Sequence, residues 1–112
     1  LMCDRRVEES IKSFEAKTLF TRIDVVIPVF NSAQWIIGCI DSVHAAFANA
    51  GLSDYTIFVV DDGSSDNLED SLHRSSSDKV SLIRQSNQGR SAARLAGARR
   101  SQASHLLFID SR

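Results

Sequence analysis

The apolar positions of the chain fall into short β-branched runs that alternate with longer stripes at helical spacing. Residues 23–29 form a nearly continuous β-branched run, which is typical of a strand buried on both faces of a parallel sheet. The apolar positions that follow recur at steps of three and four, so they predict a helix that lies on a sheet and ends at Gly51. These positions are Ile36, Ile40, Val43, Phe47 and Ala50.

The same alternation continues along the chain and predicts the fold class. Further strands are expected at residues 55–60, 80–84 and 105–109, separated by a short helix over residues 68–72 and an alanine-rich helix over residues 88–103. Strands that alternate with helices usually pair in parallel through right-handed crossovers. We therefore predict an α/β fold, an open and mostly parallel sheet with helices on both faces.

The N-terminal segment is expected to stand apart from this domain. Residues 5–17 have the pattern of a short amphipathic helix, with Asp4 as a candidate cap. Its apolar face would consist of Val7, Ile11 and Phe14. The prediction is thus an extension over residues 1–21 and a single domain over residues 22–112.

Composition and charge restrict the partners and the location. Of the 112 residues 43% are apolar and 24% charged, and the formal net charge of −1 favours neither nucleic acid nor an anionic membrane. Cys3 and Cys39 lie far apart without metal-ligand spacing, which predicts neither a zinc site nor a disulfide. No apolar run approaches the roughly 18 residues of a membrane span, and the N-terminus is unlike a signal peptide. We expect a cytoplasmic location and no membrane segment in these residues.

Polar residues follow each predicted strand, at the edge where ligands bind in sheets of this kind. Arginines also gather from residue 84 onward, with Asp110 as the one opposing acid, so an anion site is expected there. The candidate site residues are Pro28, Val29, Phe30, Asn31, Asp61, Asp62, Gly89, Arg90, Arg94 and Asp110. His44, His73 and His105 lie away from this edge, and Trp35 and Cys39 are expected to serve helix packing.

Each of these features also has a purely structural interpretation. Asp61 and Asp62 either open a turn and cap the next helix, or leave one carboxylate to accept from a uracil N3–H or from ribose hydroxyls. Gly89 either only begins a helix or lets backbone amides face a phosphate. Arg90 and Arg94 are either solvated side chains or donors to a diphosphate or a base carbonyl.

Three ordered segments resemble the nucleotide-binding part of glycosyltransferase family 2. They are IDVVIPVFNSAQWIIGCIDSV, FVVDDGSSDN and NQGRSAARLAGARRSQASHLLFID, and together they cover about residues 22–111. Three motifs in order are far more specific than any one alone. The resemblance implies the Rossmann-like half of a GT-A nucleotide-diphospho-sugar transferase fold, truncated before the half that binds the acceptor.

The resemblance also implies roles for single residues. In similar enzymes the segment matching residues 28–31 lines the nucleoside pocket, and the aspartate matching Asp61 holds the base. The position of Arg90 resembles one that contacts the base or the diphosphate, and Arg94 matches the arginine of an AARN-like run. Asp110 matches the first aspartate of the DxD motif, which touches the ribose and holds a Mn²⁺ or Mg²⁺ ion on the diphosphate.

Two residues depart from the family pattern. Leu95 stands where asparagine is usual, and Arg112 stands where DxD has its second aspartate. Arg112 weakens the metal assignment. It is either a consequence of truncation at the last residue or a genuine variant whose guanidinium offsets phosphate charge.

The implied function is binding of a nucleotide-diphospho-sugar donor, expected to be a UDP-sugar, for inverting transfer to a saccharide or lipid-linked acceptor. In related inverting enzymes the general base comes from a later segment, so no catalytic residue is expected in this fragment and it should be inactive alone. The alternative is a non-catalytic nucleotide-sugar-binding or regulatory module. A receiver-type domain fits poorly, because its acidic pair should end the first strand, which here ends in Pro28. A dinucleotide-dependent dehydrogenase fits poorly, because no GxGxxG follows that strand. A sheet cut at its fourth strand also predicts self-association through the exposed edge.

Overall fold

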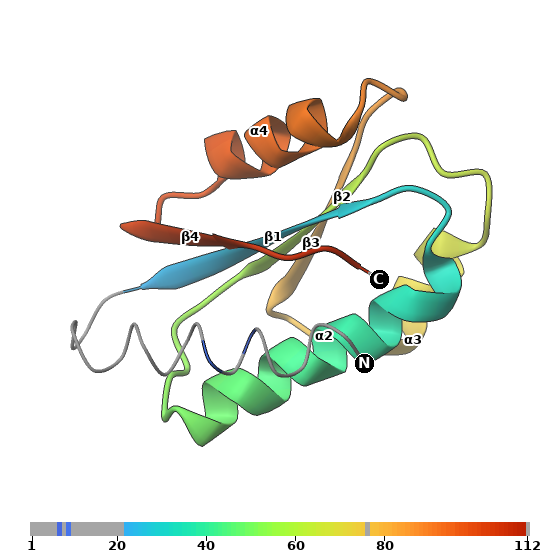
Figure 1. Cartoon of the computed structure of the whole chain (residues 1–112). Coiled ribbons are helices and arrows are strands. Elements are labelled where there is room, and N and C mark those ends of the chain that lie inside the picture. Colours follow the sequence, from blue (N-terminus) through green and yellow to red (C-terminus); the bar gives the residue numbers. More distant parts are fainter. Residues whose placement is uncertain (1–6, 8, 10–21, 76, 112) are drawn as a thin grey trace.

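Parallel strands in the order β3-β2-β1-β4 form the centre of the computed structural model, which describes residues 7, 9, 22–75 and 77–111 (Figure 1). The strands are β1 (Ile23–Val29), β2 (Ile57–Asp61), β3 (Val80–Arg84) and β4 (His105–Phe108). β1 lies between β2 and β4, and β2 also pairs with β3, always in parallel. The predicted parallel sheet is confirmed.

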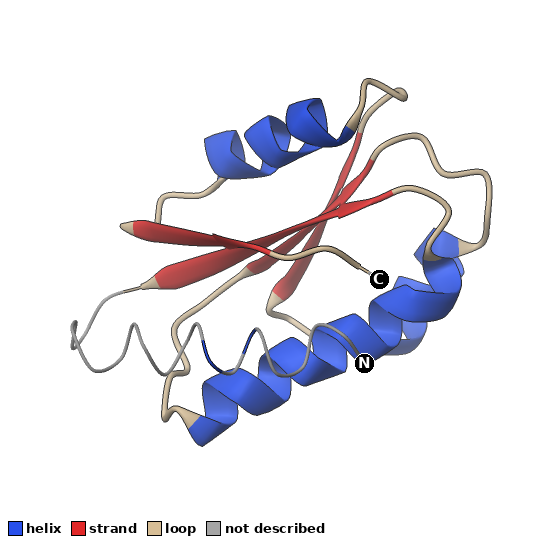
Figure 2. Cartoon of the chain, in the orientation of Figure 1, coloured by secondary structure: helices blue, strands red, loops and turns tan. Residues whose placement is uncertain are grey.

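Helices cover both faces of this sheet (Figure 2). On one face, α2 (Ala33–Asn49) packs against α3 (Leu68–Ser75), whereas α4 (Arg90–Arg100) contacts β1 and β2 from the other. The predicted fold class is therefore confirmed. None of the helices in the described part of the chain has the length and apolar character that crossing a bilayer requires.

β1 is buried on both faces along its whole length, as its β-branched sequence predicts. Successive side chains of a strand point to opposite faces. Val25 and Ile27 accordingly belong to the core beneath α2, while Val26 packs with Ala93 of α4. Burial of each such side chain stabilises the fold by about 1.5–3 kcal/mol.

α2 buries the predicted apolar stripe but not its tryptophan. Its buried residues are Ile36, Cys39, Ile40, Val43, Ala46 and Phe47. Trp35 is 37% exposed, so the expectation that it serves helix packing is wrong. Each helical residue is rotated by about 100° from the one before it, which carries Trp35 off the face that Ile36 presents to the sheet.

Some element boundaries differ from the prediction. β2 begins at Ile57 rather than at Tyr55, whose ring stacks on Phe47 with centroids 4.0 Å apart and whose hydroxyl lies 2.6 Å from Nδ1 of His44. α4 is shorter than residues 88–103 because Gly89 has a φ of +99° and the chain is extended again at residue 101. β4 ends at residue 108 rather than 109.

The N-terminal helix predicted over residues 5–17 lies almost entirely outside the described residues. Val7 and Glu9 are described, and both are helical. Val7 is buried in the core on the α2 face, whereas Glu9 is exposed. The division of the chain near residue 21 stays a prediction, as does self-association through the outer edge of β4, which pairs with no strand among the described residues.

A buried carboxylate that the sequence analysis did not single out ties together the amino end of the sheet. Asp24 accepts hydrogen bonds from the Thr56 backbone N–H at 2.9 Å and from the Ser101 hydroxyl at 2.6 Å. Nε of Arg22 lies 3.2 Å from the same carboxylate. These contacts join the beginnings of β1 and β2 to the segment after α4, so Asp24 has a structural role.

α4 approaches the sheet most closely at a glycine. A Cβ built at Gly97 would overlap Cγ1 of Val26 and lie 3.0 Å from its Cγ2. Ala93, one turn earlier, is fully buried on the same face. The close approach of α4 to the sheet therefore depends on the absence of a side chain at residue 97.

We expect Gly97→Ala to destabilise the fold by about 1–3 kcal/mol through overpacking, although alanine is the better helix former by about 1 kcal/mol. In a Val26→Ala background, which removes both Cγ atoms, the same change should be neutral or stabilising. Urea unfolding followed by circular dichroism measures both differences. Equal destabilisation in the two backgrounds would contradict the packing explanation.

Candidate functional site

The connections on the two sides of β1 diverge at its carboxyl end. From β1 the chain crosses to α2 on one face, whereas β4, next to β1, is reached through α4 on the other (Figure 1). Crevices of this kind are where open α/β sheets bind ligands. A cleft of about 310 Å³ lies there, lined by Pro28, Val29, Phe30, Ser32, Asp62, Asn87, Gly89, Arg90, Asp110 and Ser111.

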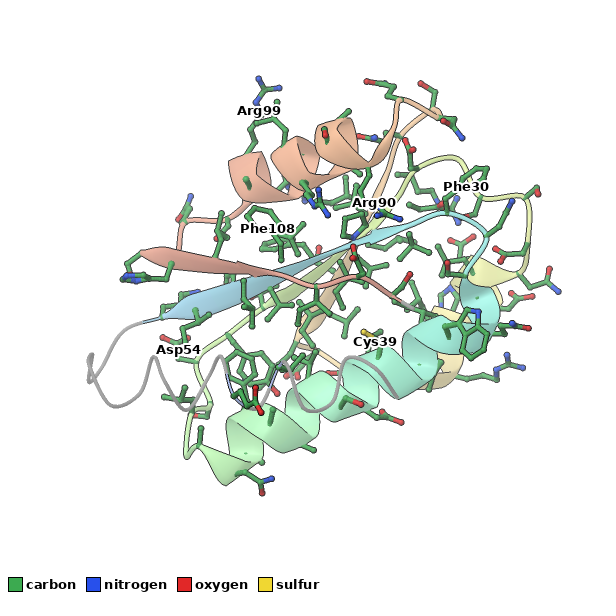
Figure 3. The ribbon with its side chains drawn as sticks, viewed as in Figure 1. Phe30, Cys39, Asp54, Arg90, Arg99 and Phe108 are labelled. Atoms are coloured by element: carbon green, nitrogen blue, oxygen red, sulfur yellow. The ribbon has the colours of Figure 1, made fainter. Side chains whose placement is uncertain are left out.

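An aromatic ring stands at one side of the cleft. Phe30, in the segment directly after β1, is 45% exposed and lines the cleft (Figure 3). The hydroxyl of buried Ser32 donates to the Phe30 carbonyl at 3.1 Å, which holds the local turn. An exposed aromatic face at a cleft offers a stacking surface for a planar ligand group.

Asn31 ties the loop after β1 to the loop after β2 and does not line the cleft. Its backbone has a φ of +51°, and its Oδ1 accepts from the Ser65 N–H at 2.8 Å. Its own N–H donates to the Ser64 hydroxyl at 3.0 Å. In the same contact region, Asp66 accepts from the N–H of Ala33 at 3.0 Å and so satisfies the first turn of α2.

Asp61 is the last residue of β2 and lies outside the cleft. Its Oδ1 accepts from the Ser64 N–H at 2.8 Å, as in the turn interpretation of this aspartate. It lines a different hollow, which is formed with residues 66–70 and with Arg84. The structure therefore does not bring Asp61 together with Phe30 and Arg90.

Asp62 lines the cleft and also holds the loop between β3 and α4. Its Oδ1 accepts from the Gln85 side chain and the Gln88 N–H, both at 2.8 Å, and its Oδ2 accepts from the Gly89 N–H at 2.9 Å. Burial alone would raise the pKa of Asp62, but these three hydrogen bonds lower it below the usual value. The carboxylate is thus charged and fixed. Oδ1 accepts two hydrogen bonds and Oδ2 accepts one.

Gly89 sets the direction in which α4 enters. Its φ of +99° and ψ of 164° belong to a region that only glycine adopts readily. Gly89 and Arg90 both line the cleft, so the amino end of α4 faces it. The first turn of α4 has no acidic residue to offset the positive end of the helix dipole.

Two arginines of α4 converge on one carboxylate oxygen. Oδ1 of Asp110 lies 3.5 Å from Nη2 of Arg94 and 4.0 Å from Nη1 of Arg90. The side chains of Arg90, Arg94 and Asp110 are 66%, 39% and 46% exposed. Arg90 lies between α4 and the sheet in Figure 3, and both guanidiniums keep donors that Asp110 does not use.

These residues form a poor ligand set for a divalent cation. Mn²⁺ and Mg²⁺ prefer several oxygen ligands, whereas Asp110 supplies one carboxylate that is already paired with two guanidiniums. The oxygens of Asp62 accept from three N–H groups, and residue 112 is an arginine. Within residues 22–75 and 77–111 and at residues 7 and 9, no group of three His, Cys, Asp or Glu side chains could hold a metal. The metal-ligand role of Asp110 therefore stays a prediction, and its pairing with two arginines does not favour it.

Most of the candidate residues come together. Pro28, Val29, Phe30, Asp62, Gly89, Arg90 and Asp110 line the cleft, whereas Asn31, Asp61 and Arg94 do not, although Arg94 reaches Asp110. Ser32, Asn87 and Ser111 also line the cleft, although they are not among the candidate site residues. Each lies within three residues of a predicted position, so the strand-end signal marked the segments but not the individual side chains that face inward.

The sheet and cleft define a Rossmann-like α/β domain similar to GT-A glycosyltransferases. The mannosyl-3-phosphoglycerate synthase of Rubrobacter xylanophilus superposes with a TM-score of 0.69 at 20% identity, over 94% of this chain and 33% of that one. The mannosyltransferase PcManGT of Pyrobaculum calidifontis, in complex with GDP-Man and Mn²⁺, gives 0.69 at 16% identity, over 97% of this chain and 35% of that one.

The family model for glycosyl transferase family 2 matches residues 24–111, and the chain belongs to this family. An uncharacterized glycosyltransferase of Rickettsia bellii is 29% identical over 80% of this chain and 13% of its own length. Another, from Nostoc sp., is 36% identical over 80% of this chain and 27% of its own length. The chain thus spans less than a third of the curated relatives that it matches.

We expect Asp62→Asn to destabilise the fold by about 1–3 kcal/mol at pH 7, because an amide replaces a charged acceptor of three hydrogen bonds. Because the folded-state pKa is lowered, this contribution is present above the unfolded-state pKa of about 3.9 and is lost as the pH falls through the folded value. Urea unfolding of both proteins between pH 7 and pH 3 measures it.

The control is Asp41→Asn, which changes an exposed carboxylate of α2. Its effect on the free energy of unfolding at pH 7 should be small. A difference between wild type and Asp62→Asn that stays constant down to pH 3 would rule out the stabilising role of the charge.

Proposed function

We propose that this chain is the donor-binding part of a glycosyltransferase and holds a nucleoside-diphosphate sugar in the cleft at the carboxyl ends of β1 and β4. One observation carries the proposal: the cleft joins an exposed aromatic ring, Phe30, to the cationic amino end of α4 with Arg90. A nucleotide has the complementary composition, a flat base at one end and a diphosphate at the other. The GDP-Man complex of the similar PcManGT supports the same ligand class.

The base is assigned to the side of the cleft formed by Phe30 and Asp62. Phe30 stacks on the base, and Oδ2 of Asp62 accepts from a base N–H, since Oδ1 already accepts twice. This role falls to Asp62 rather than to Asp61, which is engaged in the turn with Ser64. A uracil N3–H suits a single acceptor, and UDP-sugar stays the predicted donor. GDP is the competing nucleotide, because PcManGT is in complex with GDP-Man.

The reaction assigned to the whole enzyme is inverting transfer. An acceptor hydroxyl oxygen attacks the anomeric carbon, its proton passes to a general base, and the bond to the diphosphate oxygen breaks. Neither carboxylate among the described residues of the cleft is suited to act as this general base. Asp62 accepts from three donors, and Asp110 is paired with two guanidiniums. The general base and the binding site for a saccharide or lipid-linked acceptor are therefore assigned to other parts of the longer enzyme.

A non-catalytic nucleotide-sugar-binding module is the second candidate. It is favoured by the two departures at Leu95 and Arg112 and by the pairing of Asp110 with arginines. The two candidates share the cleft and its ligand. They differ in whether the longer polypeptide catalyses transfer at all. The glycosyltransferase transfers the sugar of a bound donor to water or to an acceptor, and the non-catalytic module does neither.

We expect Phe30→Ala to weaken UDP binding about tenfold, since stacking of a base on an aromatic ring is worth about 1–3 kcal/mol. Isothermal titration of the chain with UDP, and in parallel with GDP, measures the dissociation constant. Trp35→Ala is the matched control, because Trp35 is similarly exposed but does not line the cleft. Equal losses in the two variants would contradict the stacking role.

The 112-residue chain alone is expected to bind donor without transferring the sugar to an acceptor. Incubation with a panel of radiolabelled UDP-sugars and GDP-sugars, with simple saccharides as acceptors, tests this by product chromatography. Sugar transfer above the rate without protein would show that a base lies within these residues.

A further inference from the structure

We infer that guanidinium groups, rather than a divalent metal ion, neutralise the donor diphosphate at this site, and that Asp110 is their counter-ion in the free protein. The inference rests on the proposed function, since it concerns how the same cleft binds the charged part of its donor. It assigns Arg90 and Arg94 to the diphosphate and assigns Asp110 the opposite of a metal-ligand role.

The geometry of Asp110 carries the argument. Both arginines contact the same oxygen, Oδ1, at 3.5 Å and 4.0 Å. A divalent metal ion bound to that carboxylate would lie within a few ångströms of two positively charged guanidiniums. Because it carries two charges, each repulsion would be twice that between two single charges at the same distance. The carboxylate of Asp110 is therefore arranged to hold the two arginines in place and not to bind a metal ion.

The second carboxylate that lines the cleft is also poorly available to a metal ion. Asp62 is the other carboxylate lining it, and its oxygens accept three hydrogen bonds from residues 85–89. The sequence has a guanidinium, Arg112, where a second acidic ligand would follow Asp110. Among the described residues that line the cleft, a hard cation would keep one carboxylate at most, whereas cationic groups are abundant.

The two arginines suit a diphosphate. They are four residues apart at the start of α4, so their side chains share one face of the helix. The diphosphate of a nucleotide sugar carries one negative charge on each phosphate, which one guanidinium can match with paired N–H donors. The amino end of α4 adds a further positive field at the cleft.

Binding then proceeds as an exchange of partners. In the free chain Asp110 accepts from Arg94 and attracts Arg90. In the complex the phosphate oxygens take these donors, and Asp110, which is 46% exposed, turns to solvent. Asp110 therefore opposes donor binding, and its removal should strengthen binding, whereas removal of a metal ligand would weaken it.

Titration with UDP in EDTA and in Mn²⁺ tests the inference. The variants are Asp110→Asn, Arg90→Gln and Arg94→Gln, with Arg99→Gln as control, because Arg99 is exposed on the side of α4 away from the sheet (Figure 3). We expect equal dissociation constants with EDTA and Mn²⁺ in the wild type, at least threefold tighter binding by Asp110→Asn, about tenfold weaker binding by each glutamine variant of residues 90 and 94, and no change in the control.

Two results would overturn the inference. Binding by the wild type that requires Mn²⁺ and disappears in Asp110→Asn would assign Asp110 to a metal and leave the proposed donor site intact. Absence of binding to UDP and GDP under both conditions would overturn the donor site and this inference together. Circular dichroism of each variant confirms that the exposed substitutions leave the fold unchanged.

Discussion

The double burial of β1 is the constraint on which the rest of the structure depends. Its side chains alternate between the core beneath α2 and the core beneath α4, and its backbone pairs with both β2 and β4. A strand in this position cannot shift by one residue without exchanging its two sets of packing partners. The register fixes where β1 ends, and the segment that follows, with Phe30, is consequently delivered to the cleft.

Hydrogen bonds from strand ends then hold the cleft in shape. Asp62 fixes the loop that leads into α4, Asp66 satisfies the first turn of α2, and Asn31 joins the two loops between them. Asp62 both holds a loop and lines the cleft, whereas Asp66 lies outside the cleft. The charge of the site is therefore decided less by its acids, which are satisfied, than by the arginines of α4.

Local periodicity predicted most of the fold, because β-branched runs and helical stripes are set by neighbours in sequence. The strands, α2 and the two-faced arrangement were anticipated in this way, and so was the edge at which polar residues gather. What sequence could not assign were contacts between distant segments. The choice between Asp61 and Asp62 depends on which way the last strand residues face, and the capping of α2 by Asp66 spans 33 residues. The exposure of Trp35 likewise follows from the exact rotation of α2 on the sheet.

The position of β4 has a consequence for the order of folding. Among the described strands β4 comes latest in the sequence, yet it pairs with β1, with Ile23 opposite His105. Pairing of strands so distant in sequence requires closure of a long loop and is slow compared with local helix formation. On a ribosome, β1, α2 and β2 can associate while the later segments are still being made. The crevice between β1 and β4 can form only after these three elements and α4 have been made.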